Sequence, residues 1–239
     1  MAGRTDSRVR LPRLNCCTSI SHLRQLDGLS LLSSRILPSE LYGRDAVRGS
    51  KRISNPGCYA TSTQLLVAPL LKYVKSGAWP TVFGVSGYSG AGTVTGPNAP
   101  DGRPTTVAKV VPESLHGGLR PYALTDHIHE REAGRHLSSL ASAGVKVAFV
   151  PTVAPWFSGI TSVLSMPLTE KVTARDVRAL YEEKYAGEKL VKIRNDVPTL
   201  PDIENQHGWT VGGFQVHSEG DRAVVVVSGP LVCTNEGWN

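Results

Sequence analysis

Apolar residues recur at helical spacing in three stretches of this chain. A helix often begins at a threonine or aspartate with an acidic residue three positions on, and ends at glycine. Thr173 and Asp176 match such a start for the third stretch, and Gly187 matches its end. The pattern predicts three helices, over residues 60–75, 126–142 and 173–185.

Other stretches alternate apolar with polar residues or are rich in β-branched residues, as strands are. Of these, residues 213–217 and 222–227 flank a turn, which predicts a hairpin. Residues 94–120 are rich in proline, glycine and threonine and are predicted to form a long exposed loop. Strands and helices therefore mix, with at least one antiparallel pair. The other predicted strands are residues 81–85, 145–150, 160–166 and 190–194.

Composition narrows the classes of function. Of the 239 residues, 40% are hydrophobic and 19% are charged, as in ordinary globular proteins. No apolar run approaches the roughly 20 residues of a membrane-spanning helix, so no membrane association is expected. The net charge of +6 comes from basic residues that are spread along the chain. Spread charge disfavours a nucleic-acid partner and suits an anionic small substrate.

The four cysteines (Cys16, Cys17, Cys58 and Cys233) form no C-x-x-C pair. We therefore expect no disulfide framework and no metal site, and a reducing compartment fits. Residues 1–37 are rich in arginine and serine and poor in acids, which is typical of a transit peptide but also of an irregular or mis-assigned leader. The expected location is the mitochondrial matrix, with the cytoplasm as the alternative.

One cysteine stands in a distinctive motif, SNPGCYAT at residues 54–61. Asn-Pro-Gly predicts a sharp turn, with Gly57 at positive φ, and a helix follows. Cys58 would then lie where the helix presents unpaired N–H groups, an environment that favours a thiolate and stabilises an oxyanion. The alternative is a buried cysteine that merely ends a turn.

A second cluster, PYALTDHIHERE at residues 121–132, contains two histidines. With Thr125 or Asp126 as N-cap, His127 and His129 would lie in a first helical turn and diverge, so that only one points at a given atom. Either could serve as acid and base for a thiol, and Glu132 could orient His129. A metal site and a plain solvated helix face are the alternatives.

The glycine-rich stretch GVSGYSGAG at residues 84–92 does not match the dinucleotide fingerprint G-x-G-x-x-G. Its serines and backbone N–H groups could bind a phosphate or carboxylate. A plain turn is the simpler interpretation.

These motifs together resemble one family, the N-acetyl-γ-glutamyl-phosphate reductases of arginine biosynthesis. The sequence around the histidines is most similar to that of the fungal mitochondrial form, which is joined to an acetylglutamate kinase. The resemblance covers residues 38–229. It rests on the three motifs above together with ELYGR at residues 40–44 and VPTVAPWFSGI at residues 150–160.

The resemblance implies a fold, a reaction and a site. The fold would be α+β: a mixed, largely antiparallel sheet with packed helices, like the C-terminal catalytic and dimerisation domain of glyceraldehyde-3-phosphate dehydrogenase. Cys58 would displace phosphate from N-acetyl-γ-glutamyl phosphate, and NADPH would reduce the thioester to the semialdehyde. His129 or His127 would be the acid/base. The substrate pocket would be lined by Ser86, Ser89, Gly90 and Glu132, and the protein would be a homo-oligomer, with acetylglutamate kinase as a further partner.

The ends of the chain depart from the family pattern. No strand, glycine turn and helix of a complete Rossmann domain precedes residue 38, and residues 230–239 do not resemble the family's C-terminal helix. No NADPH-binding segment is therefore identified. Three other functions stay open: reduction of the one-carbon-longer N-acetyl-aminoadipyl phosphate, a non-catalytic fragment that pairs with full-length subunits, and a cofactor-free thiol hydrolase or transferase.

Overall fold

The centre of the molecule is a seven-stranded mixed sheet. The structure, a computed structural model, describes residues 34–36, 39–43, 45, 52–54, 56–141, 143–204 and 206–230. Two neighbouring pairs, β7 with β3 and β10 with β9, are parallel, and the other four are antiparallel. The predicted α+β class with a largely antiparallel sheet is confirmed. In spatial order the strands are β6 (Arg120–Pro121), β7 (Ala148–Ala154), β3 (Thr81–Gly87), β8 (Ile160–Pro167), β11 (Arg222–Gly229), β10 (Trp209–Val216) and β9 (Val191–Ile193).

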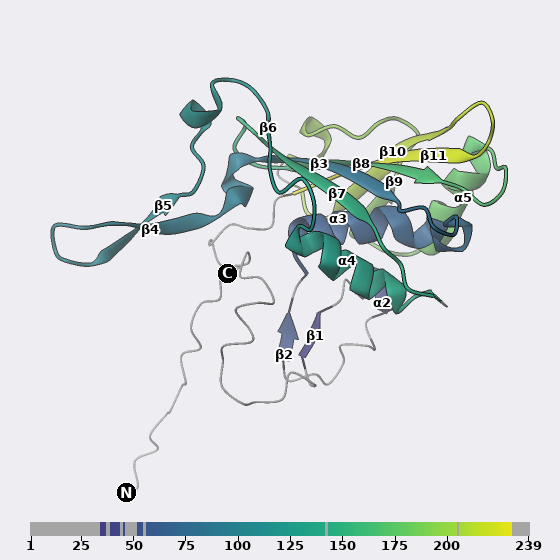
Figure 1. Cartoon of the computed structure of the whole chain (residues 1–239), viewed down its shortest axis with the longest axis horizontal. Helices are drawn as coiled ribbons and strands as arrows, with labels where there is room; N and C mark the ends of the chain where they lie inside the picture. Colours follow the sequence, from purple (N-terminus) through teal and green to yellow (C-terminus); the bar gives the residue numbers. More distant parts are fainter. Residues whose placement is uncertain are drawn as a thin grey trace, which may run out of the picture.

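Three helices lie on one face of this sheet (Figure 1). They are α3 (Cys58–Val67), which continues as the 3-10 helix η3 (Ala68–Tyr73), α4 (Ile128–Ser138) and α5 (Ala174–Lys184). All three predicted helices are confirmed. The expected capping box of α5 is present, because Thr173 and Asp176 bond each other's backbone N–H groups.

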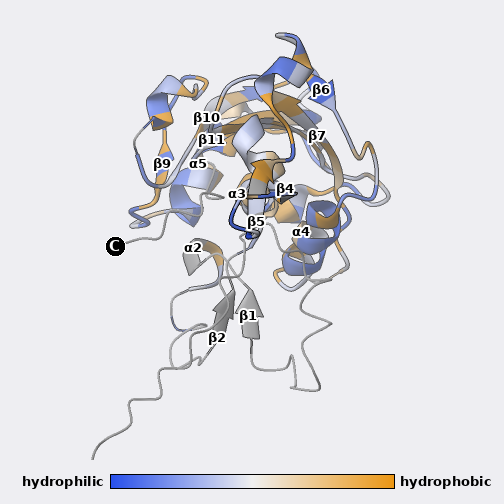
Figure 2. Cartoon of the chain, turned by 90° about the vertical axis from the view of Figure 1, so that its left-hand side faces the viewer, coloured by the Kyte–Doolittle hydropathy of each residue, from blue (hydrophilic) through white to orange (hydrophobic). Residues whose placement is uncertain are grey.

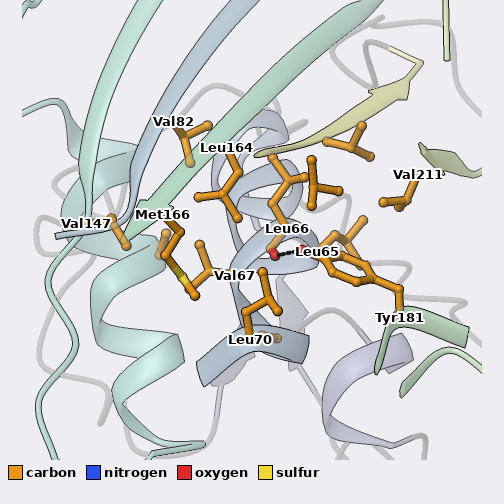
Figure 3. Packing of buried hydrophobic residues seen from close by; sticks show 14 of the residues in the cluster. Leu65, Leu66, Val67, Leu70, Val82, Val147, Leu164, Met166, Tyr181 and Val211 are labelled. Carbon is orange, nitrogen blue, oxygen red and sulfur yellow. Dashed lines mark hydrogen bonds between the residues drawn. The ribbon is translucent and has the colours of Figure 1, made fainter. Parts of the chain in front are cut away.

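The core fills the space between α3 and the sheet (Figure 3). Leu65, Leu66 and Val67 of α3 are fully or almost fully buried, as are Val82 of β3 and Leu164 of β8. Figure 2 shows β7, β10 and β11 of the sheet mostly hydrophobic and α4 mostly hydrophilic, as an amphipathic surface helix should be. The packing fixes α3, and therefore the turn at its start, against the sheet.

The helix α5 is tied to α3 by two tyrosines. Tyr181 donates a hydrogen bond to the carbonyl of Leu66, and Tyr185 donates one of 2.6 Å to the carbonyl of Leu65. Both hydroxyls are buried, so these bonds satisfy polar groups inside the core.

The opposite face of the sheet carries no α-helix among the described elements. Phe83, next to the buried Val82, is 49% exposed there. One end of this face is covered by residues 195–203, which include η6 (Pro201–Ile203). There Ser228 donates a hydrogen bond of 3.1 Å to the carbonyl of Pro198. The rest of the outer face is open.

A two-stranded hairpin projects from the body (Figure 1). It consists of β4 (Thr93–Asn98) and β5 (Pro104–Ala108) and follows the short 3-10 helix η4 (Tyr88–Ala91). Beyond it lie η5 (Pro112–Leu115) and then β6. The prediction of a loop over residues 94–120 is therefore wrong in its first half, because threonines and valines of the two runs pair across the hairpin.

Short elements precede the sheet. A parallel pair joins β1 (Ser34–Ile36) and β2 (Arg52–Ser54), and α2 (Ser39–Tyr42) follows β1. Regular structure thus begins inside the segment predicted to be irregular; the rest of residues 1–37 and the tail after Pro230 lie outside the described residues. Within the described part of the chain, no helix is long and apolar enough to cross a membrane.

Candidate active site

Cys58 is the first residue of α3 and is 8% exposed. Gly57 is the N-cap, with φ −59° and ψ 151°, and its carbonyl accepts a bond of 2.8 Å from the N–H of Thr61. No side chain of the described residues caps this helix. The N–H groups of its first turn therefore face the region around Cys58. The predicted helix is present, but the expected positive φ at Gly57 is not; Asn55 of the predicted turn lies outside the described residues.

Gly57 is needed for a different reason. A β-carbon built on it would lie 2.1 Å from Nε2 of His129 and 2.5 Å from the adjacent ring carbon. No side chain tolerates such an approach, so the imidazole of His129 packs directly on the α-carbon that precedes Cys58. The two sequence motifs, far apart in the chain, thus meet at one point.

His127 is the N-cap of α4, in place of the predicted Thr125 or Asp126. Its Nδ1 accepts a bond of 3.1 Å from the N–H of His129. Asp126 instead has φ +60° and lies in the preceding turn. An imidazole ring at the cap can fill the role of a carboxylate or hydroxyl because its unprotonated nitrogen is an acceptor. The neutral ring of His127 therefore carries its proton on Nε2.

The two imidazoles touch rather than diverge. Their centroids are 4.9 Å apart and the rings are nearly perpendicular, because His127 lies outside the helix. Burial, together with the nearby His127, lowers the pKa of His129 to about 4, and burial also lowers the pKa of His127. Both rings are therefore uncharged near neutral pH. Nδ1 of His129 is buried without a hydrogen-bond partner among the described residues.

An aromatic frame surrounds the histidines. The ring of Tyr59 lies 4.8 Å from that of Phe149 and 6.2 Å from that of His129. The Tyr59 hydroxyl donates to the carbonyl of Thr152 at 3.1 Å, and burial raises its pKa. A β-carbon on Gly84 would lie 2.3 Å from the Tyr59 ring, so only glycine fits beneath it.

Two carboxylates hold the start of α4 on opposite sides. Oε1 of Glu132 accepts a bond of 3.2 Å from the N–H of Gly57, and Oε2 of Glu130 accepts one of 3.2 Å from the N–H of Phe149. Burial raises the pKa of Glu132, and the bond from Gly57 partly offsets this. The predicted hydrogen bond of Glu132 to His129 is replaced by the bond to Gly57.

The serines of the glycine-rich stretch are placed differently from one another. Ser86, at the end of β3, is 3% exposed and lies beside Tyr59, where it lowers the pKa of the phenol and so partly offsets the effect of burial. Ser89 and Gly90 lie further on, in η4, where the Ser89 N–H donates to the carbonyl of Phe157 at 3.1 Å. The Ser89 hydroxyl is buried without a partner among the described residues. Ser86 thus lies next to Tyr59, whereas Ser89 lies beyond β3, against the backbone of Phe157.

The described residues contain no metal site and no dinucleotide-binding unit. They hold no group of three His, Cys, Asp or Glu side chains placed to bind a metal ion. The glycine-rich stretch after β3 leads through η4 into the strand β4, not into the helix that a dinucleotide-binding turn requires. The described residues therefore do not fit NADPH as a unit of their own.

Two residues of the frame were not singled out from the sequence. Two sequence features could have indicated Tyr59. It follows Cys58 in the same motif, and Gly84 lies inside a predicted strand, where a glycine often marks the close approach of another group. Phe149 had no such feature beyond its place in a predicted strand.

A family model, "Semialdehyde dehydrogenase, dimerisation domain", matches residues 58–228, most of the chain. The chain belongs to the semialdehyde dehydrogenase family. In fold, this member of the family is similar to aspartate semialdehyde dehydrogenase from Francisella tularensis, with a TM-score of 0.60 at 14% identity. That match covers 84% of this chain and 67% of the other.

Curated relatives are closer in sequence. The chain is 42% identical to "Protein arg11, mitochondrial" of Schizosaccharomyces pombe, over 95% of this chain and 25% of that protein. It is also 42% identical to the N-acetyl-gamma-glutamyl-phosphate reductase of Xanthomonas axonopodis pv. citri, over 81% of this chain and 57% of that enzyme. The predicted resemblance is confirmed, and the chain spans a quarter to just over half of these relatives.

Proposed function

We propose that this chain carries the acyl-transfer site of an N-acetyl-γ-glutamyl-phosphate reductase. The observation that carries the proposal is the packing of the His129 imidazole on Gly57, directly before Cys58 at the start of α3. A thiol nucleophile needs an adjacent base, and here the two motifs that supply them meet. The glutamyl substrate is preferred over the aminoadipyl one because the bacterial relatives are named for it.

In the proposed reaction, Sγ of Cys58 attacks the carbonyl carbon of the acyl phosphate. The carbon–sulfur bond forms, the carbon–oxygen bond to phosphate breaks, and phosphate leaves with the electron pair. His129 accepts the thiol proton, for which its neutral ring is suited. His127 is the weaker candidate, since its Nδ1 already accepts the bond that caps α4. N–H groups of the first turn of α3 stabilise the developing oxyanion.

Reduction of the thioester to the aldehyde requires a hydride, which NADPH supplies in the proposed overall reaction. The chain spans only 57% of the bacterial reductase, so the nucleotide is proposed to bind to a part of the protein beyond the described residues. Ser86, Ser89 and Gly90 are the proposed lining of the substrate pocket, within a catalytic unit over residues 38–229.

The family model that matches is a dimerisation domain, and we infer that the open outer face of the sheet joins two copies. Phe83 is the large apolar side chain exposed there. The mitochondrial matrix is the proposed location, because the fungal relatives are named as mitochondrial, with the cytoplasm as the alternative. Acetylglutamate kinase stays a proposed partner, since the fungal relatives are about four to five times longer than the matched part.

Release of phosphate tests the acyl-transfer step without any nucleotide. The full chain is mixed with N-acetyl-γ-glutamyl phosphate, and phosphate is measured together with the mass of the Cys58 peptide. We expect one phosphate per chain and an acyl adduct on Cys58, with neither in Cys58→Ala. Equal release by Cys58→Ala would refute the assignment of Cys58 as nucleophile. The rate with N-acetyl-aminoadipyl phosphate, measured in the same way, tests the choice of the glutamyl substrate.

A further inference from the structure

The carboxylate of Glu132 lies at the junction between α4 and Gly57, the N-cap of α3. The residue is only 7% exposed, and its Oε1 accepts the 3.2 Å bond from the N–H of Gly57. His129, one helical turn earlier on α4, packs on the α-carbon of that same Gly57. Glu132 therefore holds the peptide that joins the nucleophile to the surface on which the imidazole rests.

Glu130 provides an internal comparison. It lies on the same helix and accepts a backbone bond of the same 3.2 Å, but from Phe149 of β7. Removing Glu130 would loosen α4 from the sheet, whereas removing Glu132 would loosen α4 from the Cys58 turn. The bond of Glu130 thus anchors the helix to the sheet, whereas the bond of Glu132 places the nucleophile, and variants of the two residues test these roles separately.

We propose that Glu132 is a positioning residue, which through its bond to the Gly57 N–H fixes Cys58 relative to His129. The proposal rests on the proposed function for the roles of Cys58 and His129. It replaces the expectation that Glu132 binds substrate. What the position requires is an acceptor that reaches Gly57, and the amide oxygen of glutamine supplies one as well as a carboxylate does.

Alkylation of Cys58 by iodoacetamide tests this in the full chain, with no substrate or nucleotide present. The rate at neutral pH is followed on the Cys58 peptide by mass spectrometry, which separates it from the other three cysteines. Glu132→Gln keeps the acceptor, Glu132→Met keeps the volume without it, and Glu130→Ala is the matched control. Glu132→Ala takes the place of Glu132→Met if the latter does not fold.

We expect Glu132→Met to react at least about tenfold more slowly, because a misplaced imidazole no longer activates the thiol. Glu132→Gln and Glu130→Ala should stay within about threefold of the parent chain, a small change beside the loss expected from misplacement. Slow reaction of Glu132→Gln would mean that the charge matters and would overturn the proposal. So would slow reaction of Glu130→Ala, or a rate in Glu132→Met at or above that of the parent.

Phosphate release by the same variants separates this inference from the proposed function. A positioning role lowers the maximal rate constant of this single turnover in Glu132→Met and leaves the half-saturating substrate concentration unchanged. A raised half-saturating concentration at constant rate would show substrate binding by Glu132 and overturn the proposal. If the parent chain releases no phosphate, the proposed function fails, and the alkylation rates still decide the role of Glu132.

Discussion

The two faces of the sheet are built from alternate residues of the same strands, but helices cover one face and leave most of the other exposed. On β3, Val82 is fully buried beneath α3, and the next residue, Phe83, is 49% exposed. The covered face carries the helices that hold Cys58 and His129, so its packing sets the geometry of the site. The open face packs against no such helices within one copy of the chain, and its exposed apolar residues therefore indicate a partner.

The difference shows what each face tolerates. On the covered side, glycines are required by contacts: Gly57 by His129 and Gly84 by Tyr59. On the open side, a side chain can change without moving the helices beneath. Variants that differ only in which face they alter should therefore separate activity and stability from self-association.

The largest effect is expected for Gly57→Ala. Its φ of −59° suits alanine, so the backbone is not strained, but the new β-carbon would meet His129 at 2.1 Å and push the imidazole away. We expect phosphate release to slow by about 10²–10⁴, the usual contribution of a general base. Gly144→Ala, where a β-carbon has nothing within 4 Å, is the control. An unchanged rate in Gly57→Ala would contradict the placement of His129.

The next effect compares two neighbours on β8. Leu164 is fully buried on the covered face, and Val163 points to the open face, where it is partly exposed. Leu164→Ala should lower the free energy of unfolding by about 2–5 kcal/mol, the usual range for a buried leucine. Val163→Ala should cost less than about 1 kcal/mol, since less burial is lost. Urea unfolding of both variants measures this, and equal losses would show that the faces are equally covered.

The sequence predicted this layered arrangement because helices and strands have different hydrophobic periods. The capping box at Thr173 and Asp176 located α5 to within a residue. The β4–β5 hairpin was missed because its alternation of apolar and polar residues is short and is interrupted by proline and glycine, which are typical of loops. No local signal distinguished it.

The candidate site was predicted in part. Motifs singled out Cys58, His127 and His129 as candidates because each stands at the start of a helix with an unusual local sequence, but they did not decide between the two histidines. The cap by His127, the contact of His129 with Gly57 and the partner of Glu132 all join segments distant in the chain. Such contacts depend on how α4 packs against α3, which no single stretch of sequence encodes.

A third effect concerns the open face itself. If two copies pair there, Phe83→Ser removes an aromatic side chain from the interface, and dimerisation should weaken by about 1.5–3 kcal/mol per side chain. Phe157→Ser is the matched control, because Phe157 is 60% exposed but lies beyond the end of β7, against Tyr88. Sedimentation at several concentrations measures the dimer. Equal dimer strength in the parent chain and Phe83→Ser would place the interface elsewhere.

The smallest effect is expected at the solvent-facing start of α5, on the covered side but outside the core. Thr173→Ala removes one half of the capping box and should lower the free energy of unfolding by about 0.5–2 kcal/mol. The hydroxyl and the N–H of Thr173 hold the pKa of Asp176 below its usual 3.8. Asp176 therefore stabilises the fold above that value, and its contribution is lost as pH falls below it. Unfolding measured between neutral and strongly acidic pH should show a smaller acid-dependent loss in Thr173→Ala than in the parent chain. An identical pH profile would mean that Asp176 is held by something other than this cap.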